Sequence, residues 1–461
     1  GWARQADFGV RFSVRIPRLD GPMNQQEMID ACLKYTLYSW SATGSVNPLP
    51  IERAEGIYLY GPKGQRWIDF NSQCMSVNIG HGHPKVIQAI KDQADTLIYT
   101  IPGSATKARA RLGKRMAELV PGNINTFFFT LSGAESNENA IKAVRQFSGR
   151  FKILSRYRSY HGATNACMQL TGDPRRIPNE PGSPGFVHVM DPWPYTFSWG
   201  ETEEEITEKN LIYLEEIIQY EGPETIAAMF IESVTGTNGI LPPPRGYLKG
   251  LRVLLHKYGI LLVCDEVMSG WGRTGKLFGF EHGDIVPDVV TMAKGLTSSY
   301  LPLGAVGLSD PIAKYFQDNV FWGGLTYNAH ALCMGTALAA IDVLVEEKLV
   351  ENSATLGLVM RSEIDRLTAK HPSVKGGRCI GLFGMVDIQK NSAGDPIVPY
   401  NTNSPVMAAF ARRLLENGLF TFLRWGSFFC NPPLCITREQ LLEAFAIIDE
   451  ALEVCDAAFE G

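Results

Sequence analysis

Apolar runs and helical patterns alternate over the middle of the chain. Five short runs rich in branched or aromatic residues are separated by segments of helical periodicity. Strands buried on both faces of a sheet have near-continuous apolar runs of this kind. Their alternation with helices predicts an α/β fold, a mostly parallel central sheet wrapped by helices. The predicted strands are residues 126–130, 151–154, 226–231, 259–264 and 289–292.

The two ends of the chain have a different pattern. Residues 51–70 alternate like a hairpin, and beyond residue 336 helical patterns mix with short strand patterns. We predict that residues 1–75 join residues 336–461 in a smaller α+β domain, and that residues 76–335 form the large domain. Helices are expected over residues 25–41, 85–96, 105–119, 329–347, 352–370, 404–417 and 438–459, with strands near 381–388 and 420–429.

Composition and charge exclude several classes of protein. The chain has 461 residues, 45% of them hydrophobic and 20% charged, which is close to the average of soluble globular proteins and excludes a disordered or collagen-like chain. The net charge of -5 and the absence of any block of like charges give no reason to expect nucleic acid or an anionic membrane as a partner. No apolar stretch approaches the ~18 residues of a membrane span. These features favour small-molecule chemistry.

Cysteines and the N-terminus bear on location. None of the nine cysteines forms a Cys-x-x-Cys pair, which predicts reduced thiols and a cytoplasmic location. The first 22 residues contain four arginines and two acids, a bias of organelle transit segments, but they lack a clear amphipathic stripe. A transit segment, an ordinary N-terminal arm and a foreign remnant before Met23 all stay open.

Two glycine-rich motifs are rejected as nucleotide or metal sites. Residues 270–275 match the dinucleotide fingerprint, yet residues 276–288 hold two glycines and a proline and do not supply the helix that this motif must open. Leu277 stands where a phosphate loop needs Ser or Thr. His81 and His83 have no third ligand at a matching spacing, so a turn before a helix is the preferred interpretation.

Polar residues follow the predicted strands. Ligands of open α/β sheets bind just beyond the carboxyl ends of the strands, so these residues are expected to converge on one rim. They are, in chain order, Ser132-Gly133-Ala134, Tyr160-His161, Glu232, Asp265-Glu266 and Lys294.

Three of these positions have a specific chemical interpretation. Small residues at a helix start let a phosphate approach free N–H groups, although Ser132 as a simple N-cap is an equal alternative. A lysine at the end of a buried strand is costly unless it is paired or used covalently, which favours a Schiff-base role for Lys294 over a salt bridge. Asp265 ends the most apolar strand, and its alternative is a helix cap or an ion pair.

Together these groups are the set that pyridoxal phosphate chemistry requires. A lysine holds the aldehyde, and a buried carboxylate keeps the pyridine nitrogen protonated because an opposite charge favours the charged form. The cofactor then serves as an electron sink, an aromatic face stacks on its ring, and the freed lysine moves a proton.

Several stretches resemble the signature of class III aminotransferases of pyridoxal-phosphate fold type I. They are residues 261–267, 272–275, 293–296 and 302–305, within a likeness that extends from about Glu55 to Leu442. The resemblance implies that Lys294 binds the cofactor covalently, that Asp265 contacts the pyridine nitrogen, and that Val267 and Tyr160 press on the two ring faces. Lys294, Asp265 and Tyr160 are the catalytic candidates.

The resemblance also implies a phosphate site and a homodimer. Gly133 and Ala134 would hold the phosphate through backbone N–H groups, joined by Thr326 from the neighbouring subunit. The other cofactor contacts expected are Ser132, His161 and Glu232.

The substrate side departs from the family pattern. The position of the mobile arginine of many ω-transaminases holds Phe422, while Arg424 stands two residues later. Arg424 is interpreted either as a clamp for a carboxylate or sulfonate or as an ion-pair partner. Met75 and the tryptophans at 40, 67 and 425 line either a substrate pocket or the core; Trp40, Met75 and Arg424 are the substrate candidates.

We therefore expect an aminotransferase that moves an amino group from an ω-amino acid or amine to a 2-oxo acid. Pyruvate is the expected acceptor, in a ping-pong cycle through the pyridoxamine form. Another reaction of the same cofactor is the alternative, as in aminomutases, racemases and decarboxylases, and a non-catalytic scaffold is a third interpretation. The expected partners are small molecules and a second copy of the chain, with no nucleic acid and no membrane.

Overall fold

The computed structural model describes residues 21 and 23–461, so the arginine-rich N-terminal segment lies outside the described residues. The chain divides into two compact units. The first runs to Arg53 and includes Tyr60–Gln65, and the second comprises Ala54–Leu59 and Arg66–Gly461. Among the described residues no helix is long and apolar enough to cross a membrane.

The first unit contains helix α1 (Gln25–Tyr35). The Asn24 side chain caps this helix by accepting from the backbone N–H groups of Gln26 and Glu27, both at 3.0 Å. Such a cap satisfies donors that have no partner within the helix. The helix ends at Tyr35, six residues before the predicted end at Ser41.

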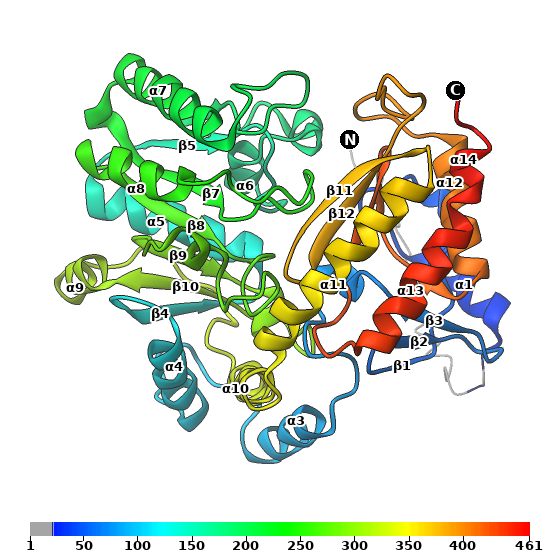
Figure 1. Cartoon of the computed structure of the whole chain (residues 1–461). Coiled ribbons are helices and arrows are strands. Elements are labelled where there is room, and N and C mark those ends of the chain that lie inside the picture. The colour runs from blue at the N-terminus through cyan, green and yellow to red at the C-terminus, as the bar shows by residue number, and fades with distance from the viewer. Residues whose placement is uncertain (1–20, 22) are drawn as a thin grey trace, which may run out of the picture. The chain divides into compact units, whose positions relative to one another are not determined.

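A seven-stranded sheet forms the centre of the second unit (Figure 1). Its order is β4 (Ile124–Thr130), β10 (Gly304–Ser309), β9 (Val289–Met292), β8 (Leu261–Asp265), β7 (Ile226–Glu232), β5 (Lys152–Arg156) and β6 (Phe186–Val189). Strand β10 pairs antiparallel with both β4 and β9, and the other pairs of this sheet are parallel. The predicted mostly parallel α/β sheet is confirmed, and all five predicted strands lie in it.

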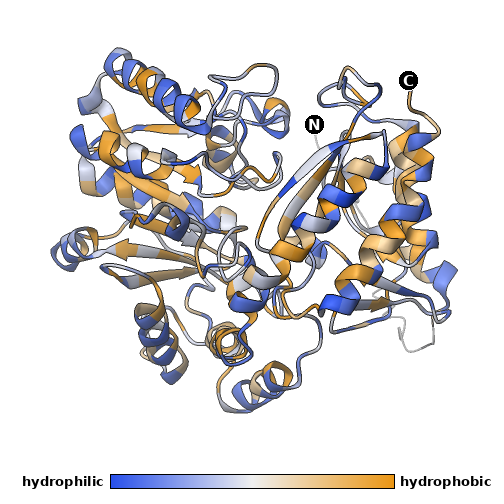
Figure 2. Cartoon of the chain, in the orientation of Figure 1, coloured by the Kyte–Doolittle hydropathy of each residue, from blue (hydrophilic) through white to orange (hydrophobic). Residues whose placement is uncertain are grey.

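Helices cover this sheet. Helix α5 (Gly133–Ser148) packs against β7, β9 and β10, whereas α8 (Tyr247–Lys257) packs against β8 and α7 (Glu203–Glu221). Figure 2 shows mostly hydrophobic residues along the central strands and alternating hydrophilic and hydrophobic turns on α7. The remaining helices of this part are α2 (Ser72–Met75), α3 (Pro84–Thr96), α4 (Lys107–Leu119), α6 (Asn165–Leu170), α9 (Asp310–Asp318) and α10 (Ala331–Glu346).

The C-terminal part has a second, antiparallel sheet. Its order is β11 (Val374–Ile380), β12 (Phe383–Ile388), β15 (Ser427–Cys430) and β14 (Leu423–Arg424). The helices here are α11 (Leu349–Lys370), α12 (Pro405–Glu416), α13 (Arg438–Ala451) and α14 (Glu453–Asp456). Thus the predicted terminal helix over 438–459 is two helices.

A third sheet joins the two ends of the chain. Its order is β1 (Arg53–Glu55), β2 (Tyr58–Tyr60), β3 (Arg66–Asp69) and β13 (Leu419–Phe420). Strand β13 runs parallel to β3, with Leu419 opposite Ile68. The N-terminal and C-terminal segments therefore share a sheet, while the domain boundaries at 75 and 335 stay predictions.

The rejected glycine motif opens no α-helix. After Gly275 the chain makes turns and a short 3₁₀ helix (Gly279–Gly283), so the prediction that residues 276–288 do not supply the helix of a dinucleotide fingerprint is confirmed. His81 and His83 bond separate carboxylates: His81 Nε2 lies 2.8 Å from Asp69 Oδ2, and His83 Nε2 lies 2.9 Å from Glu347 Oε1.

Asp449 joins α13 to the end of α11. Its carboxylate accepts from Lys370 Nζ and Arg366 Nη1, both at 2.5 Å, and lies 2.7 Å from His371 Nε2. Desolvation alone would raise the pKa of Asp449, but these hydrogen bonds outweigh it and hold that pKa well below its usual value. The ionised carboxylate therefore stabilises the fold.

This cluster predicts a pH-dependent contribution to stability. Because the pKa of Asp449 is lower in the folded than in the unfolded chain, its stabilisation is present above about pH 4 and is lost as the pH falls through the folded-state pKa. We expect Asp449→Asn to lower the Tm by about 2–4 °C at pH 7 and by less at pH 3, measured by differential scanning fluorimetry. The exposed Glu450→Gln serves as control. Equal losses at both pH values would contradict this role.

Candidate active site

Three adjacent parallel strands end at one rim of the large sheet. Glu232, the last residue of β7, stands opposite Asp265, the last residue of β8, and Asp265 stands opposite Thr291 of β9. Lys294 follows two residues after the end of β9. The structure therefore brings together a lysine and two carboxylates that are far apart in the sequence.

The Lys294 ammonium is buried at this rim. Desolvation lowers its pKa. The charges of Cys74, Asp265 and Glu232 act in the other direction, because they favour the protonated form, but desolvation is the larger effect. No hydrogen bond or ion pair to its amine is present within the described part of the chain. Its backbone has a φ of +43°, a region that a residue with a side chain rarely adopts. A lysine that is easily deprotonated is suited to act as a nucleophile.

Asp265 is fixed by three donors. Its Oδ2 accepts from Asn137 Nδ2 at 2.8 Å and lies 2.8 Å from His161 Nδ1, while its Oδ1 accepts from the Val267 N–H at 3.0 Å. Asn137 is itself oriented, because its Oδ1 accepts from Thr291 Oγ1 at 2.8 Å. Asp265 is 3% exposed. The carboxylate is thus held in one orientation without water.

Glu232 organises the neighbouring loop. Its Oε1 accepts from the Tyr160 N–H at 3.0 Å, and its Oε2 accepts from the Gly236 N–H at 2.7 Å. Burial raises the pKa of this carboxyl. The contacts place Glu232 beside Tyr160, where it fixes the backbone of that aromatic residue.

The start of α5 leaves two backbone donors free. Ser132 is its N-cap, accepting from the Glu135 N–H at 3.2 Å, as the alternative interpretation of this residue predicted. Across the described residues the N–H groups of Gly133 and Ala134 have no acceptor. A Cβ on Gly133 would lie 2.8 Å from Val267 Cγ1, so only glycine fits here. This arrangement suits an anion such as a phosphate.

Sequence patterns missed a second cluster beside Tyr160. The guanidinium carbon of Arg175 lies 3.7 Å from the centroid of the Tyr160 ring, a cation–π distance. Asp173 Oδ2 accepts from Arg175 Nη2 at 2.5 Å and from Arg424 Nη2 at 3.2 Å. Two arginines therefore share one buried carboxylate. Asp173 caps a short 3₁₀ helix (Pro174–Asn179) that contains Arg175 and has no periodicity to mark it, and Asn137 lies inside an α-helix.

Arg424 is paired in this structure. In addition to Asp173, its Nη2 donates to Asn238 Oδ1 at 3.1 Å, and its guanidinium carbon lies 4.4 Å from the Trp425 ring centroid. Its Nε is buried without a hydrogen-bond partner. Arg424 is thus an ion-pair partner, as one of its two interpretations predicted. The carboxylate that it pairs with also binds Arg175.

The other predicted contact residues lie in different surroundings. Met75 is buried in a small apolar cluster with Val234, Met268 and Phe383. Trp67 is buried and donates to the Leu415 carbonyl at 3.0 Å. Trp40 belongs to the first unit and Thr326 is exposed, so their roles stay predictions.

The aminotransferase class-III family model matches residues 40–452. The chain belongs to the class III aminotransferases. A taurine:2-oxoglutarate aminotransferase of Bifidobacterium kashiwanohense, solved with pyridoxal phosphate and glutamate, superposes with a TM-score of 0.92 and 38% identity, covering 95% of this chain and all of that one. An (S)-enantioselective ω-transaminase of Thermomicrobium roseum superposes with a TM-score of 0.90 and 34% identity, covering 94% of this chain and 100% of that one. The diaminobutyrate–2-oxoglutarate transaminase of Halomonas elongata is 31% identical over 94% of this chain and 97% of its own length.

As a class III aminotransferase, the protein uses pyridoxal 5'-phosphate. The rim fits this cofactor: a free pair of N–H groups suits its phosphate, a buried and oriented carboxylate suits its ring nitrogen, and a buried amine suits its aldehyde. When bound, the cofactor withdraws electrons from the substrate carbon that loses a proton.

Asn137 is expected to position the Asp265 carboxylate, and a substitution tests this role. Asn137→Ala removes the amide that orients Asp265, so we expect kcat/KM to fall about 10- to 100-fold and pyridoxal phosphate to bind more weakly in equilibrium dialysis. Asn139→Ala is the matched control, because Asn139 lies on the same helix and donates to the Glu135 carbonyl. This role would be excluded if Asn137→Ala bound the cofactor with unchanged affinity. It would also be excluded if the control lost the same affinity.

Proposed function

We propose that the protein transfers an amino group from an ω-amino acid or amine to a 2-oxo acid by a ping-pong cycle. The observation that carries the proposal is the placement of Asp265 at the end of β8 and of Lys294 just beyond the end of the neighbouring β9, beside the arginine pair at Asp173. The first product leaves before the acceptor binds, so a single site serves both substrates.

Each residue has a defined task in this proposal. Lys294 holds the cofactor, and its Nζ then takes the proton from the substrate carbon that carries the amino group. Asp265 contacts the ring nitrogen and keeps it charged, because a nearby anion favours the protonated form. Val267 and Tyr160 confine the ring, and His161 and Asn137 hold the Asp265 carboxylate in place.

The phosphate is proposed to bind at the start of α5. The free N–H groups of Gly133 and Ala134 receive it, and the partial positive charge of the helix end favours the anion. Ser132 contributes by fixing this helix start. Glu232 acts through the backbone of Tyr160.

The arginine pair is proposed to bind the acidic end of a substrate. A carboxylate or sulfonate replaces Asp173 as the partner of Arg175 or Arg424, so a buried cation always has an anion beside it. This exchange lets the site accept both an acidic and a neutral donor. Similar proteins are named for taurine and for γ-aminobutyrate, which both have an acidic end.

Pyruvate is the acceptor expected from the sequence, and 2-oxoglutarate is a second candidate. Two arginines at one carboxylate favour a substrate with two acidic groups, and two relatives are named for 2-oxoglutarate. Comparison of kcat/KM for the two acceptors with one donor decides between them. Product that forms without any acceptor would instead indicate a decarboxylase, aminomutase or racemase.

A homodimer completes the proposed site with Thr326 of the neighbouring subunit. Thr326 is exposed, and its carbonyl accepts from the Tyr99 hydroxyl at 2.7 Å. Ile98, Ile101 and Trp322, which flank these two residues in the sequence, are 52%, 67% and 75% exposed. Large exposed apolar residues mark interfaces when they gather.

All nine cysteines are free, which supports the proposed cytoplasmic location.

Removal of the Lys294 amine tests the proposed chemistry. We expect Lys294→Ala to lose at least about 1000-fold in turnover, measured as keto product formed from a donor and a 2-oxo acid, because nucleophile and base are one group. Lys276→Ala removes an exposed lysine of the same part of the chain and should keep full activity. Circular dichroism verifies the fold. Wild-type turnover in Lys294→Ala would overturn the proposal.

Removal of an arginine tests the acidic-end site. In single-turnover reactions with the donor alone, we expect Arg175→Met to weaken binding of 4-aminobutyrate about 10- to 100-fold, because a charge-assisted hydrogen bond is lost. Binding of 1-phenylethylamine, which has no acidic group, should change little. Arg424→Lys retains the charge and serves as a control at the second arginine. Equal losses for both donors would show that Arg175 acts on the fold and not on the acidic group.

A further inference from the structure

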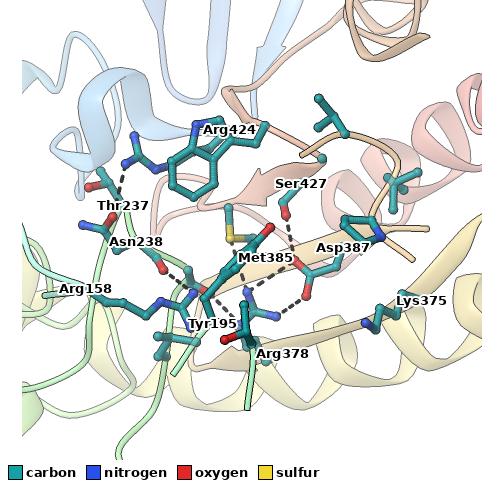
Figure 3. Close-up of a pocket in the computed structure, with 18 residues that line it drawn as sticks. Arg158, Tyr195, Thr237, Asn238, Lys375, Arg378, Met385, Asp387, Arg424 and Ser427 are labelled. Carbon is teal, nitrogen blue, oxygen red and sulfur yellow. Dashed lines mark hydrogen bonds and ion pairs between the residues drawn. The ribbon is translucent and has the colours of Figure 1, made fainter. Parts of the chain in front are cut away.

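A cavity of about 450 Å³ lies beside the arginine pair, a size typical of small-molecule sites (Figure 3). Arg158, Tyr195 and Asn238 line it from the large-sheet side, and Arg378, Arg424 and Trp425 line it from the C-terminal side. Lys294, Asp265 and Tyr160 do not line it. The cavity therefore lies outside these rim residues and adjoins the arginine pair at Arg424 and at Thr237, whose hydroxyl accepts from Arg175 Nη2 at 2.8 Å.

The wall of this cavity has an excess of positive charge. Four cationic side chains face one carboxylate, that of Asp387, which leaves an excess of three positive charges. Asp387 already pairs with Arg378 and accepts from Ser427 Oγ at 2.7 Å. The carboxylate is thus fully engaged, so the remaining cations have no anion within the cavity.

Arg158 is a half-buried cation of this wall whose guanidinium donates to backbone carbonyls. Its Nη1 donates to the Trp193 carbonyl at 2.9 Å, and its Nη2 donates to the Asn238 carbonyl at 2.7 Å. No carboxylate pairs with its guanidinium among the described residues. Desolvation lowers the pKa of Arg158, as expected for a charge that burial disfavours. An anion in the cavity would compensate this charge.

Another part of the wall is apolar and aromatic. The rings of Tyr195 and Trp425 lie 6.4 Å apart between centroids, and the guanidinium of Arg158 lies 5.8 Å from the Tyr195 ring. Met385 and Val398 continue this surface. Figure 3 shows Tyr195 between Arg158 and Arg378. A ligand with a flat apolar body and one acidic group matches both parts of the wall.

We propose that this cavity binds an aromatic carboxylate, with its acidic group facing Arg158 and its ring against Tyr195 and Trp425. This ligand goes beyond the proposed aminotransfer, because it binds outside the Lys294 rim and is not consumed. Its contact with Arg424 places it next to the arginine pair of the substrate site.

The proposal is tested by calorimetric titration of the enzyme loaded with pyridoxal phosphate. We expect phenylacetate to bind once per chain, and neutral phenylacetamide to bind at least about tenfold more weakly, because a hydrogen-bonded charge pair is lost. Arg158→Met should weaken phenylacetate binding about 10- to 100-fold. Trp425→Leu, which keeps all charges, should weaken it by removing the aromatic wall. Lys390→Met, an exposed lysine outside the cavity, should leave binding unchanged.

Three results would overturn the proposal. The first is no saturable binding of phenylacetate up to about 10 mM, the range of very weak affinity. The second is equal affinity for phenylacetamide. The third is binding that Arg175→Met abolishes while Arg158→Met retains it, since the ligand would then occupy the substrate site. Circular dichroism of each variant separates loss of the site from loss of the fold, and a normal turnover assay of Arg158→Met shows that aminotransfer is intact in that variant.

Discussion

Burial of an amine at the end of a parallel strand is the constraint on which this structure depends. The strands that lead to the rim are apolar and almost fully enclosed, so water does not solvate Lys294 there. An isolated buried cation is costly. Two carboxylates at the ends of the next strands, Asp265 and Glu232, offset part of that cost. The sheet register that aligns these residues is therefore as important to the site as the residues themselves.

The carboxylates in turn depend on a second layer of contacts. Asp265 keeps its orientation through Asn137 and His161, and Glu232 fixes the loop that carries Tyr160. Oriented groups in a water-free site need no reorganisation when charge develops during a reaction. At the arginine pair, the Asp173 carboxylate pairs with both Arg175 and Arg424, and in the proposed function a substrate anion takes its place.

The sequence predicted the elements with strong patterns. The runs that became β7 and β8 are continuous and apolar, and the residues after them lie at the rim as expected. The pattern did not predict β10 or β11, because glycines interrupt both: Gly304 and Gly307 in one, Gly376 and Gly377 in the other. Residues whose role depends on tertiary contacts were also missed. Asp173 and Arg175 lie at the start of a short 3₁₀ helix, and only the fold brings them to Tyr160 and Arg424.

The most direct test of the account is to locate the residue that binds the cofactor. The loaded enzyme is reduced with sodium borohydride and digested, and its peptides are mapped by mass spectrometry. We predict a single cofactor adduct, on the peptide that contains Lys294, and no adduct when the enzyme is reduced after removal of the cofactor. An adduct on a different lysine, in an enzyme that still transfers amino groups, would contradict it.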